Sequence, residues 1–322
     1  MDLSIAIQMD AVESMQISGD TTFALGLEAQ KRGYNLWYYT PDRLSLNEGC
    51  VSARGQKITF YDQIGAHFET GGIETRSLQD FDVVLMRQDP PFDMAYITAT
   101  YLLEMLSPRT MVVNNPAEVR NAPEKLLVTL YPDLMPATVI SRDSDVISAF
   151  RQKHQDIIIK PLFGNGGAGV FRLKPGDQNL NSLLEMFFCI NREPLMVQAY
   201  LPAVRDGDKR VILVDGKPVG AVNRIPNDDE VRSNFHAGGI AAKTKLTERD
   251  LKICSTIGPE LRRRGLLFVG IDIIGNYMTE INVTSPTGIR EIERLSGIDV
   301  ASLTWDAIEQ KHSDYIGNGM RQ

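Results

Sequence analysis

Short apolar runs alternate with amphipathic stretches along residues 1–121. The runs that predict buried strands are residues 3–9, 35–39, 81–86 and 110–113. Helices are expected over residues 20–33, with Asp20 or Thr21 as the cap and Gly33 as the stop, and over residues 93–106. This β-α-β order predicts a small, mostly parallel sheet. The polar, glycine-rich stretch 40–79 predicts an irregular insertion with a hairpin near residues 56–61.

Prolines between residues 116 and 123 interrupt this order, and we expect a domain boundary there. Beyond it, helices are predicted over 124–131, 144–153 and 180–188, and strands over 137–140, 156–161, 170–173 and 195–201. Asp215 and Gly216 separate the apolar runs 209–214 and 217–222, and Asp-Gly suits the type I′ turn of a hairpin. A long amphipathic helix is expected over 247–264, ending at Gly265.

The 322 residues of the chain are too many for one small core and fit two domains, or one domain of two lobes. A total of 34 Lys and Arg against 41 Asp and Glu gives a net charge of −7, which argues against broad nucleic-acid binding. Any phosphate site must therefore be a local cluster of basic side chains and metal. The first apolar run indicates a strand rather than a signal peptide, and no apolar stretch is long enough for a membrane span.

Three cysteines, Cys50, Cys189 and Cys254, lie far apart and form no C-x-x-C motif. An odd number of widely spaced cysteines is typical of a reducing compartment. We therefore expect a cytoplasmic protein in which the cysteines are small buried residues. The four histidines lack the spacing of zinc ligands.

Asp272, Glu280, Asn282 and Arg290 lie in one stretch near the C-terminus. The two carboxylates and the carboxamide are on adjacent predicted short strands. Their carboxylate and carboxamide oxygens suit Mg²⁺, which proteins hold with a few carboxylates plus substrate phosphates. A charged hairpin face in water is the alternative. Glu280 and Asn282 share a strand face. Asp272 joins them only if the turn has a three-residue loop or an equivalent bulge, which we predict.

Gly164, Gly166 and Gly169 match the dinucleotide fingerprint G-x-G-x-x-G. That fingerprint needs a helix to begin at the third glycine, but Val170 and Phe171 favour a strand. A dehydrogenase is therefore discounted. We expect either a flexible hairpin loop that folds over phosphates or an ordinary mobile surface loop. The chain has no Walker A motif, so it is not a P-loop NTPase.

Lys160 favours the phosphate interpretation. It ends the apolar run 157–159 directly before the glycine loop, where its ammonium group is a compact charge for phosphate. Lys125, taken alone, would be a solvated helix lysine. The strand at 198–201 has a backbone edge suited to an adenine, and a plain core strand is equally consistent with its pattern.

Lys125, residues 157–161, the glycine loop and residues 206–211 and 279–288 together resemble ATP-grasp ligases, most closely the bacterial glutathione synthetase family. The resemblance covers almost the whole chain, and its most specific parts are residues 86–104, 200–216 and 270–293. It implies an α/β protein with a Rossmann-like pre-ATP-grasp domain over 1–121. The implied ATP-grasp fold follows over 122–315, in two α+β lobes at about 122–200 and 201–315, before a flexible tail at 316–322.

The resemblance also implies a reaction. The C-terminal carboxylate of γ-glutamylcysteine attacks the γ-phosphate of ATP, and the amine of glycine then attacks the acyl phosphate to form glutathione, with release of ADP and phosphate. Such chemistry depends on positioning and charge neutralisation, and the sequence accordingly has no Ser-His-Asp or Cys-His nucleophile signature. The alternatives are another ATP-grasp ligase, of D-alanine–D-alanine or glutamate-adding type, and an ATP-binding module without turnover.

The site residues carried over by resemblance fall into three groups. The nucleotide group comprises Lys125 and Lys160 for the phosphates, Gly164, Asn165, Gly166, Gly167 and Gly169 as their cover, Gln198, Ala199, Tyr200 and Leu201 for the adenine, and Asp208. The metal group, for two Mg²⁺ or Mn²⁺ ions, comprises Asp272, Glu280 and Asn282. The transfer and peptide group comprises Arg210 and Arg224 on the transferred phosphoryl group, and Ser285, Thr287, Gly288, Arg290, Arg87 and Phe23.

The polar stretch 226–239 predicts either a disordered surface loop or, by the resemblance, a lid. Such a lid would be poorly ordered without ligands and would shield the acyl phosphate from water, with Arg232 as its contact residue. Relatives suggest a homotetramer, and no nucleic-acid or membrane partner is expected. Gln88 stands where many relatives carry a basic residue, which leaves its role open.

Overall fold

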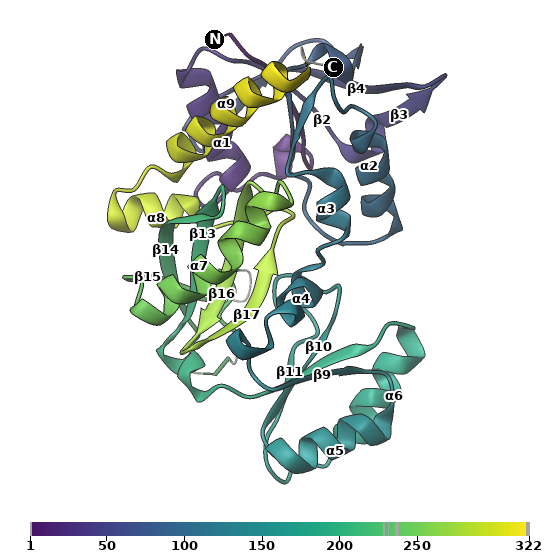
Figure 1. Ribbon diagram of the computed structural model, residues 1–322, viewed down its shortest axis with the longest axis vertical. Coiled ribbons are helices and arrows are strands. Elements are labelled where there is room, and N and C mark those ends of the chain that lie inside the picture. The colour runs from purple at the N-terminus through teal and green to yellow at the C-terminus, as the bar shows by residue number, and fades with distance from the viewer. Residues whose placement is uncertain (1, 228, 231, 236–237, 320–322) are drawn as a thin grey trace.

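The computed structural model describes residues 2–227, 229–230, 232–235 and 238–319, with residues 316–319 described by backbone alone. Three bodies follow one another along the long axis of the molecule (Figure 1). An N-terminal body lies at one end, a small lobe at the other, and a central body between them. The short helix α4 (Glu124–Leu127) lies where the chain leaves the N-terminal body for the small lobe.

The N-terminal body is built on one sheet, which has eight strands in the described part of the chain. These are β1 (Ser4–Gln8), β2 (Asn35–Tyr39), β3 (Leu44–Asn47), β4 (Cys50–Phe60), β5 (Phe68–Thr70), β6 (Glu74–Ser77), β7 (Val83–Met86) and β8 (Met111–Val113). Strand β1 pairs in parallel with β2 and β7, and β7 pairs in parallel with β8. The small parallel sheet predicted from the sequence is therefore confirmed.

The stretch 40–79 is more regular than predicted. Its long strand β4 pairs antiparallel with β2, β3, β5 and β6, so the predicted hairpin is one part of a larger antiparallel extension. The expectation of an irregular insertion was wrong because β4 alternates buried and exposed side chains. Val51, Ala53, Ile58 and Phe60 are buried while neighbours such as Arg54 and Lys57 are exposed.

Helices α1 (Thr21–Lys31), α2 (Met94–Glu104) and α3 (Pro116–Arg120) belong to this body. Asp20 caps α1 by accepting a hydrogen bond from the Phe23 amide, and Gly33, with φ +83°, follows its end as predicted. Helix α9 (Val300–Gly319) returns from the far end of the sequence to pack against α1 (Figure 1). Trp305 Nε1 donates to the Leu25 carbonyl at 2.8 Å. The helix enters the range 316–322 expected as a tail, of which 320–322 lie outside the described residues.

The small lobe is a four-stranded antiparallel sheet, in the order β11-β10-β12-β9, covered by two helices. Its elements are β9 (Thr138–Ser141), α5 (Ser144–His154), β10 (Ile157–Pro161), β11 (Phe171–Leu173), α6 (Leu180–Ile190) and β12 (Leu195–Ala199). Each was predicted to within a few residues. The core between sheet and helices includes Ile147, Ile157, Ile159, Leu184 and Phe187.

The central body is a five-stranded sheet, in the order β15-β14-β13-β16-β17, among the described residues. Its elements are β13 (Asp208–Val214), β14 (Lys217–Ile225), β15 (Ile240–Lys243), α7 (Glu248–Arg263), β16 (Phe268–Ile274), β17 (Tyr277–Asn282) and α8 (Ile289–Ser296). Asp215 and Gly216 both have positive φ and join β13 to β14, as the predicted type I′ turn requires. Helix α7 is capped by Thr247 and followed by Gly265, also as predicted.

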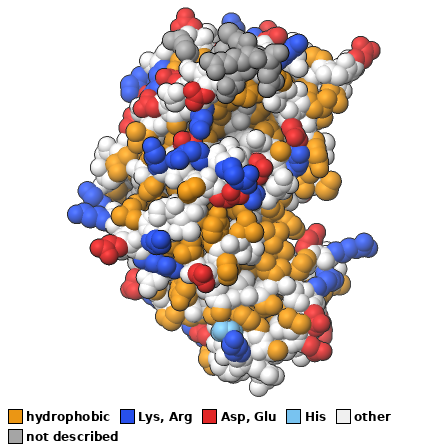
Figure 2. Space-filling model, in the orientation of Figure 1, with side chains coloured by type: hydrophobic (Ala, Val, Ile, Leu, Met, Phe, Trp, Pro, Cys, Tyr) orange, Lys and Arg blue, Asp and Glu red, His pale blue; other side chains and the backbone are white. Residues whose placement is uncertain are grey.

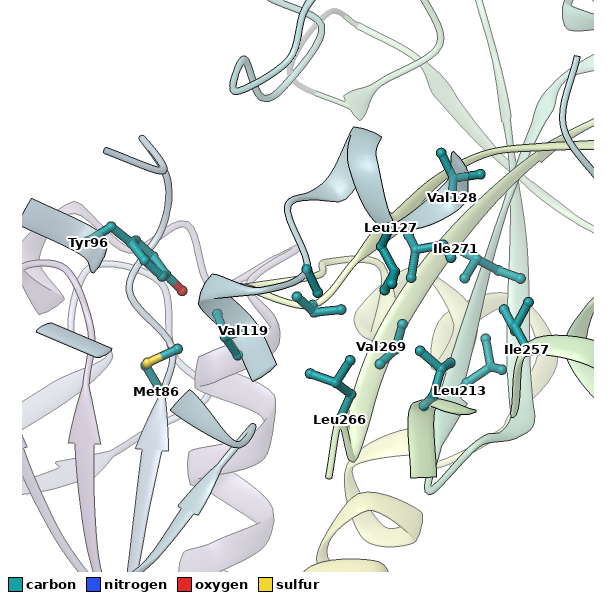
Figure 3. Close-up of a cluster of buried hydrophobic side chains, with 14 of the residues drawn as sticks. Met86, Tyr96, Val119, Leu127, Val128, Leu213, Ile257, Leu266, Val269 and Ile271 are labelled. Carbon is teal, nitrogen blue, oxygen red and sulfur yellow. The ribbon is translucent and has the colours of Figure 1, made fainter. Parts of the chain in front are cut away.

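One hydrophobic core crosses from the N-terminal body into the central body. Figure 3 shows Met86, Tyr96 and Val119 on one side and Leu127, Val269 and Ile271 on the other, all from one cluster of buried residues. Asn114 reinforces this joint: its side-chain amide donates to the Phe268 and Val283 carbonyls, both at 2.8 Å, and accepts from the Phe268 amide. The two ends of the β16–β17 hairpin are thereby tied to the N-terminal body.

The β16–β17 hairpin has the register that the sequence argument required. Asp272 lies directly opposite Glu280, and the register then shifts so that Ile273 pairs with Met278 and Ile274 with Tyr277. The turn itself has two residues, and the extra residue is a bulge at Thr279. The predicted bulge is confirmed, and Asp272 and Glu280 share one face of the sheet.

Gly216 and Gly297 have the same backbone angle, φ +73°, in different surroundings. A Cβ at Gly216 would lie 2.3 Å from the Gly258 carbonyl oxygen, whereas nothing in the described structure lies within 4 Å of one at Gly297. We expect Gly297→Ala to cost about 1–2 kcal/mol of unfolding free energy through backbone strain, and Gly216→Ala clearly more. Chemical denaturation of both variants measures this, and equal losses would contradict the close approach of α7.

Candidate functional site

A cleft between the small lobe and the central body gathers most of the predicted nucleotide and metal residues. It encloses about 820 Å³, including its open mouth. Figure 2 shows the molecule indented on one side between the N-terminal body and the small lobe, with hydrophobic side chains gathered beside the indentation. The predicted residues that line the cleft are Lys125, Lys160, Gly164, Asn165, Gly166, Gly167, Gln198, Ala199, Tyr200, Leu201, Asp208, Arg232, Asp272 and Glu280.

Two buried lysines share one carboxylate at the base of this cleft. Glu280 Oε1 lies 3.4 Å from Lys160 Nζ and 3.6 Å from Lys125 Nζ. Burial lowers the pKa of Lys160. Burial alone would raise the pKa of Glu280, but the two ammonium groups outweigh it and hold that pKa below its ordinary value. Lys125 Nζ also lies 3.8 Å from Glu124 Oε2. The two ammonium groups are compact point charges of the kind that bind phosphate.

The glycine loop closes the cleft on the side of the small lobe. The Gly164 carbonyl accepts a hydrogen bond from Lys125 Nζ at 2.5 Å, so α4 and the loop are joined. Gly166, Gly167 and Gly169 all have positive φ. The loop leads into strand β11 rather than a helix, which confirms that the dinucleotide fingerprint does not apply. From the stretch 226–239, Arg232 Nη1 donates to the Gly167 carbonyl at 3.4 Å.

The predicted adenine segment forms the end of β12 and the turn after it. Gln198 Nε2 donates to Thr138 Oγ1 at 3.0 Å. The amides of Ala199 and Tyr200 donate to carbonyls within the small lobe, and the Arg172 guanidinium lies 3.5 Å above the Tyr200 ring. These side chains line the cleft, and their role in holding an adenine stays a prediction.

A buried chain of arginines and aspartates extends from the cleft into the central body. Asp272 Oδ1 lies 2.5 Å from Arg210 Nε, and Asp272 Oδ2 lies 2.8 Å from an Arg224 guanidinium nitrogen. Asp208 Oδ2 accepts from the same Arg224 nitrogen at 2.6 Å and from Ser233 Oγ at 2.7 Å. The two guanidinium groups hold the pKa of Asp272 well below its usual range despite burial, whereas burial raises the pKa of Asp208 to about 6.

Two family models match the chain, one over the N-terminal body and one over the small lobe and the central body. Residues 3–120 match the N-terminal domain of prokaryotic glutathione synthetase, and residues 124–297 match its ATP-grasp domain. The chain belongs to the prokaryotic glutathione synthetase family. This confirms the family to which the sequence motifs pointed.

Relatives that align over nearly their whole length are named glutathione synthetase. The glutathione synthetases of Mesorhizobium japonicum and Brucella melitensis are each 58% identical to the chain over 311 residues. These alignments cover 97% of the chain and 99% and 100% of the relatives. The glutathione synthetase of Escherichia coli is 45% identical over 311 residues, 96% of the chain and 98% of the relative.

Solved ATP-grasp structures share the fold. The ATP-grasp ligase PsnB, complexed with a minimal precursor, matches with a TM-score of 0.64 at 19% identity, covering 97% of the chain and 100% of PsnB. The D-cycloserine synthetase DcsG matches with a TM-score of 0.65 at 14% identity, covering 96% and 99%. At these identities the likeness concerns the fold alone, and it confirms the predicted ATP-grasp architecture.

The predicted metal group consists of oxygen donors. Asp272 and Glu280 face each other across β16 and β17, and Asn282 ends β17 two residues after Glu280. No group of three or more His, Cys, Asp or Glu side chains could hold a metal ion within the described ranges. Two carboxylates and one carboxamide are nevertheless the donor chemistry of Mg²⁺, which takes its remaining ligands from phosphates and water. The residues present therefore fit the group that the family implies.

The predicted peptide residues gather at a second place, where the N-terminal body meets the turn after β17. Arg87 is buried and donates to Thr22 Oγ1 at 3.1 Å and to the Pro286 carbonyl at 3.3 Å. The Ser285 hydroxyl donates to the Arg87 carbonyl at 3.3 Å. This junction joins the N-terminal body to the chain segment that follows the metal group.

Other predicted residues surround this junction. Arg290 pairs with Asp62 at 2.9 Å and lies 5.7 Å above the Phe23 ring, which is itself fully buried in the core of the N-terminal body. The Thr287 carbonyl accepts from Arg210 Nη1 at 3.3 Å, and Gly288 precedes α8. Among the described residues, the predicted site residues that do not line the cleft are Gly169, Arg210, Arg224, Asn282, Phe23, Arg87, Ser285, Thr287, Gly288 and Arg290.

Other residues in and beside the cleft were not predicted from the sequence. Ser233 and Asn234 line it, although the stretch around them was considered only for Arg232. Glu124 lies beside Lys125, and burial raises its pKa to about 7. Its adjacency to Lys125 was the only signal available in the sequence. Residues 228, 231, 236 and 237 of the predicted lid lie outside the described residues. That the lid is poorly ordered without ligands stays a prediction.

The cysteine expectation was partly wrong. Cys254 is buried, but Cys50 and Cys189 are exposed thiols. Cys50 begins the antiparallel extension strand β4 and Cys189 lies near the end of α6, both of which face solvent there. None of the described helices combines the length and apolarity needed to cross a membrane.

Proposed function

We propose that the chain is an ATP-dependent glutathione synthetase, which joins γ-glutamylcysteine and glycine and releases ADP and phosphate. The observation that carries this proposal is the position of Glu280. It lies between the two buried lysines of the nucleotide cleft and faces Asp272, whose arginine partner Arg210 also contacts the Thr287 carbonyl of the peptide junction. The lysine pair, the carboxylate pair and the peptide junction are thus connected by ion pairs, one cross-strand pair and one side chain–backbone hydrogen bond.

In the first half of the reaction, Lys125 and Lys160 bind phosphate oxygens of ATP, and the glycine loop covers them. Arg210 and Arg224 neutralise charge that develops as the peptide carboxylate attacks the γ-phosphate. Asp272, Glu280 and Asn282 would hold two Mg²⁺ ions, which would supply Lewis-acid charge neutralisation. Arg87, Ser285 and Arg290 orient the peptide so that its carboxylate reaches the phosphate, and the acyl phosphate forms between the two groups.

The proposal includes an assignment of two domains. We place the pre-ATP-grasp domain at 1–121 and the ATP-grasp domain at 122–315, and α9 crosses this division because it packs on α1. A cytoplasmic location and a homotetramer belong to the proposal as well. Size-exclusion chromatography with light scattering of the purified protein tests the oligomer, and a monomer would contradict it.

Two other functions compete with this one. A non-catalytic ATP-binding module is disfavoured by the lysine pair and the carboxylate pair in one cleft, together with Arg210, which pairs with Asp272 of that cleft. A ligase for other substrates is disfavoured by the 58% identity of full-length glutathione synthetases. An assay of ADP release distinguishes each of them from glutathione synthesis.

The test is substrate-stimulated ADP release by the purified protein. With ATP and Mg²⁺, γ-glutamylcysteine plus glycine is expected to stimulate ADP release and to yield glutathione in equal amount. D-alanine alone, or a peptide carboxylate with glutamate as acceptor, is expected to stimulate little. Stimulation only by a pair without glycine would overturn the proposal in favour of another ligase, and ATP binding without ADP release would favour the module.

A further inference from the structure

Tyr200 is the aromatic side chain among the predicted adenine residues, and it lines the nucleotide cleft. It directly follows β12, where the chain leaves the sheet of the small lobe. Its backbone is fixed there, because the Tyr200 amide donates to the Asp156 carbonyl at 2.9 Å. A fixed backbone still leaves a side chain its rotamer freedom. The contacts of the ring therefore decide how well this wall of the cleft is ordered.

Arg172 of β11 covers the Tyr200 ring. The centre of its guanidinium group lies 3.5 Å from the ring centroid. At that distance the planar cation stacks on the aromatic face, and the contact is stronger because only 18% of the Arg172 side chain is exposed. Arg172 was not predicted from the sequence to belong to the site, and it is not among the described residues that line the cleft. Its contact with the cleft is the Tyr200 ring.

Asp156 fixes the orientation of this guanidinium group. Its two carboxylate oxygens accept hydrogen bonds from Arg172 Nε at 3.0 Å and from Arg172 Nη2 at 2.7 Å. Such a two-point contact fixes the plane of a guanidinium group as well as its position. Because the Asp156 carbonyl also accepts from the Tyr200 amide, one residue ties both partners of the stack to the start of β10.

Strand pairing places the stack on the cleft side of the small lobe. Arg172 lies directly opposite Ile158 in the β10–β11 pair, so the two side chains share a face of the sheet. Ile158 lines the cleft, whereas its neighbours Ile157 and Ile159 belong to the core between the sheet and the helices. Arg172 is thus on the face toward the nucleotide cleft and not in the core.

We propose that Arg172 is a positioning residue for the nucleotide: by stacking on Tyr200 it holds one wall of the adenine site in place before ATP binds. The inference rests on the proposed function, because that proposal assigns Tyr200 to the adenine. A wall that is ordered in advance spares the nucleotide the cost of ordering it, so the gain appears in affinity. Other residues make the proposed phosphate contacts, so kcat should depend little on Arg172.

The first measurement is the affinity for ADP, by titration calorimetry, in wild type and in Arg172→Gln. Glutamine removes the cation from the ring. We expect the Kd of ADP and the KM for ATP to rise by about 5-fold, the scale of one cation–π contact. The kcat and the KM for γ-glutamylcysteine should stay near their wild-type values. An Arg172→Gln protein with unchanged ADP affinity overturns the proposal.

A double-mutant cycle shows whether Arg172 acts through the ring. In a Tyr200→Leu background, Arg172→Gln should change ADP affinity little, because no ring remains to be held. If Arg172→Gln weakens ADP binding by the same factor in both backgrounds, its charge acts on the nucleotide directly and the positioning role is refuted. Calorimetry gives the number of binding-competent sites separately from their affinity, so a loss of folded protein does not imitate weaker binding.

Arg142→Gln is the matched control. Arg142 lies over the Phe188 ring of the same lobe, 4.6 Å from its centroid, and neither residue is among those that line the cleft in the described structure. Its replacement should leave the affinity for ADP unchanged. If Arg142→Gln weakened ADP binding as much as Arg172→Gln, the loss would reflect a loosened lobe, and the specific role of Arg172 would be overturned.

The failures of the two inferences are distinguishable, since ADP binding needs neither γ-glutamylcysteine nor glycine. A wild-type protein that binds ADP but forms no glutathione overturns the proposed function, while the ADP affinities still decide the role of Arg172. A wild-type protein that forms glutathione, together with an Arg172→Gln variant that binds ADP normally, overturns the positioning role alone.

Discussion

Replacing Glu280 by glutamine is expected to lower glutathione formation by at least about 100-fold, the scale on which removing one electrostatic contact slows an enzyme. Glu280 lies between two lysine ammonium groups and faces Asp272 across the hairpin. Glutamine keeps the shape but removes the charge that positions Lys125 and Lys160 and that would bind Mg²⁺. Initial rates measured over a range of Mg²⁺ concentrations should show both a lower maximum and a higher half-saturating concentration.

Fold stability should change much less in this variant. Glu280 is 20% exposed toward an open cleft, so water or an anion can replace its contacts with the lysines. Glu118→Gln is the matched control, because Glu118 pairs with Arg264 at 3.2 Å outside the cleft. That control should keep nearly full activity. A Glu280→Gln enzyme with wild-type Mg²⁺ dependence would remove Glu280 from the metal group.

Replacing Asp272 by asparagine is expected to destabilise the fold itself, by about 3–5 kcal/mol. The Asp272 carboxylate lies 2.5 and 3.0 Å from Arg210 and 2.8 Å from Arg224, and all three side chains are buried. Asparagine would leave two buried guanidinium groups with too little negative charge nearby. Equilibrium denaturation of the purified variant measures the loss, and activity should be lost along with stability.

Asp215→Asn serves as the control for that experiment. Asp215 also contacts two cations, Arg262 at 3.1 Å and Lys311 at 3.2 Å, but it is 28% exposed and its turn position suits asparagine. Its replacement should cost less than about 1 kcal/mol. If Asp272→Asn cost no more than Asp215→Asn, the buried network would contribute little to folding.

The pH dependence of this effect has a definite sign. The folded-state pKa of Asp272 lies below its ordinary value of 3.8, so its stabilising contribution is complete above that value. The contribution is lost as pH falls from the unfolded-state pKa through the lower folded-state pKa. The stability difference between wild type and Asp272→Asn should therefore be constant near neutral pH and shrink only below about pH 4.

Most secondary structure could be predicted from local pattern. The parallel strands β1, β2, β7 and β8, the elements of the small lobe, the Asp215-Gly216 turn and helix α7 were all expected from apolar runs and stop signals. The regularity of β4 was missed because polar residues fill its exposed positions. Helices α8 and α9 were not predicted, and the docking of α9 on α1 depends on a contact such as Trp305 with Leu25, 280 residues apart.

The composition of the site was also accessible from the sequence, in part through family resemblance. Fourteen predicted residues line one cleft, from Lys125 to Glu280, although their positions in the chain are widely separated. The membership of Asp272 was argued from hairpin register, and a single bulge at Thr279 decides it. What local pattern could not supply was the burial of Glu124, which raises its pKa to about 7.

The sequence by itself determined which chemical groups this protein has: two lysines, a glycine loop, two arginines and a carboxylate–carboxamide set. Spacing and residue type are local properties, so they can be read directly from the sequence. Only the tertiary structure decided which of these groups touch. The division between a nucleotide cleft and a peptide junction follows from long-range packing, because it brings together groups more than 100 residues apart in the chain.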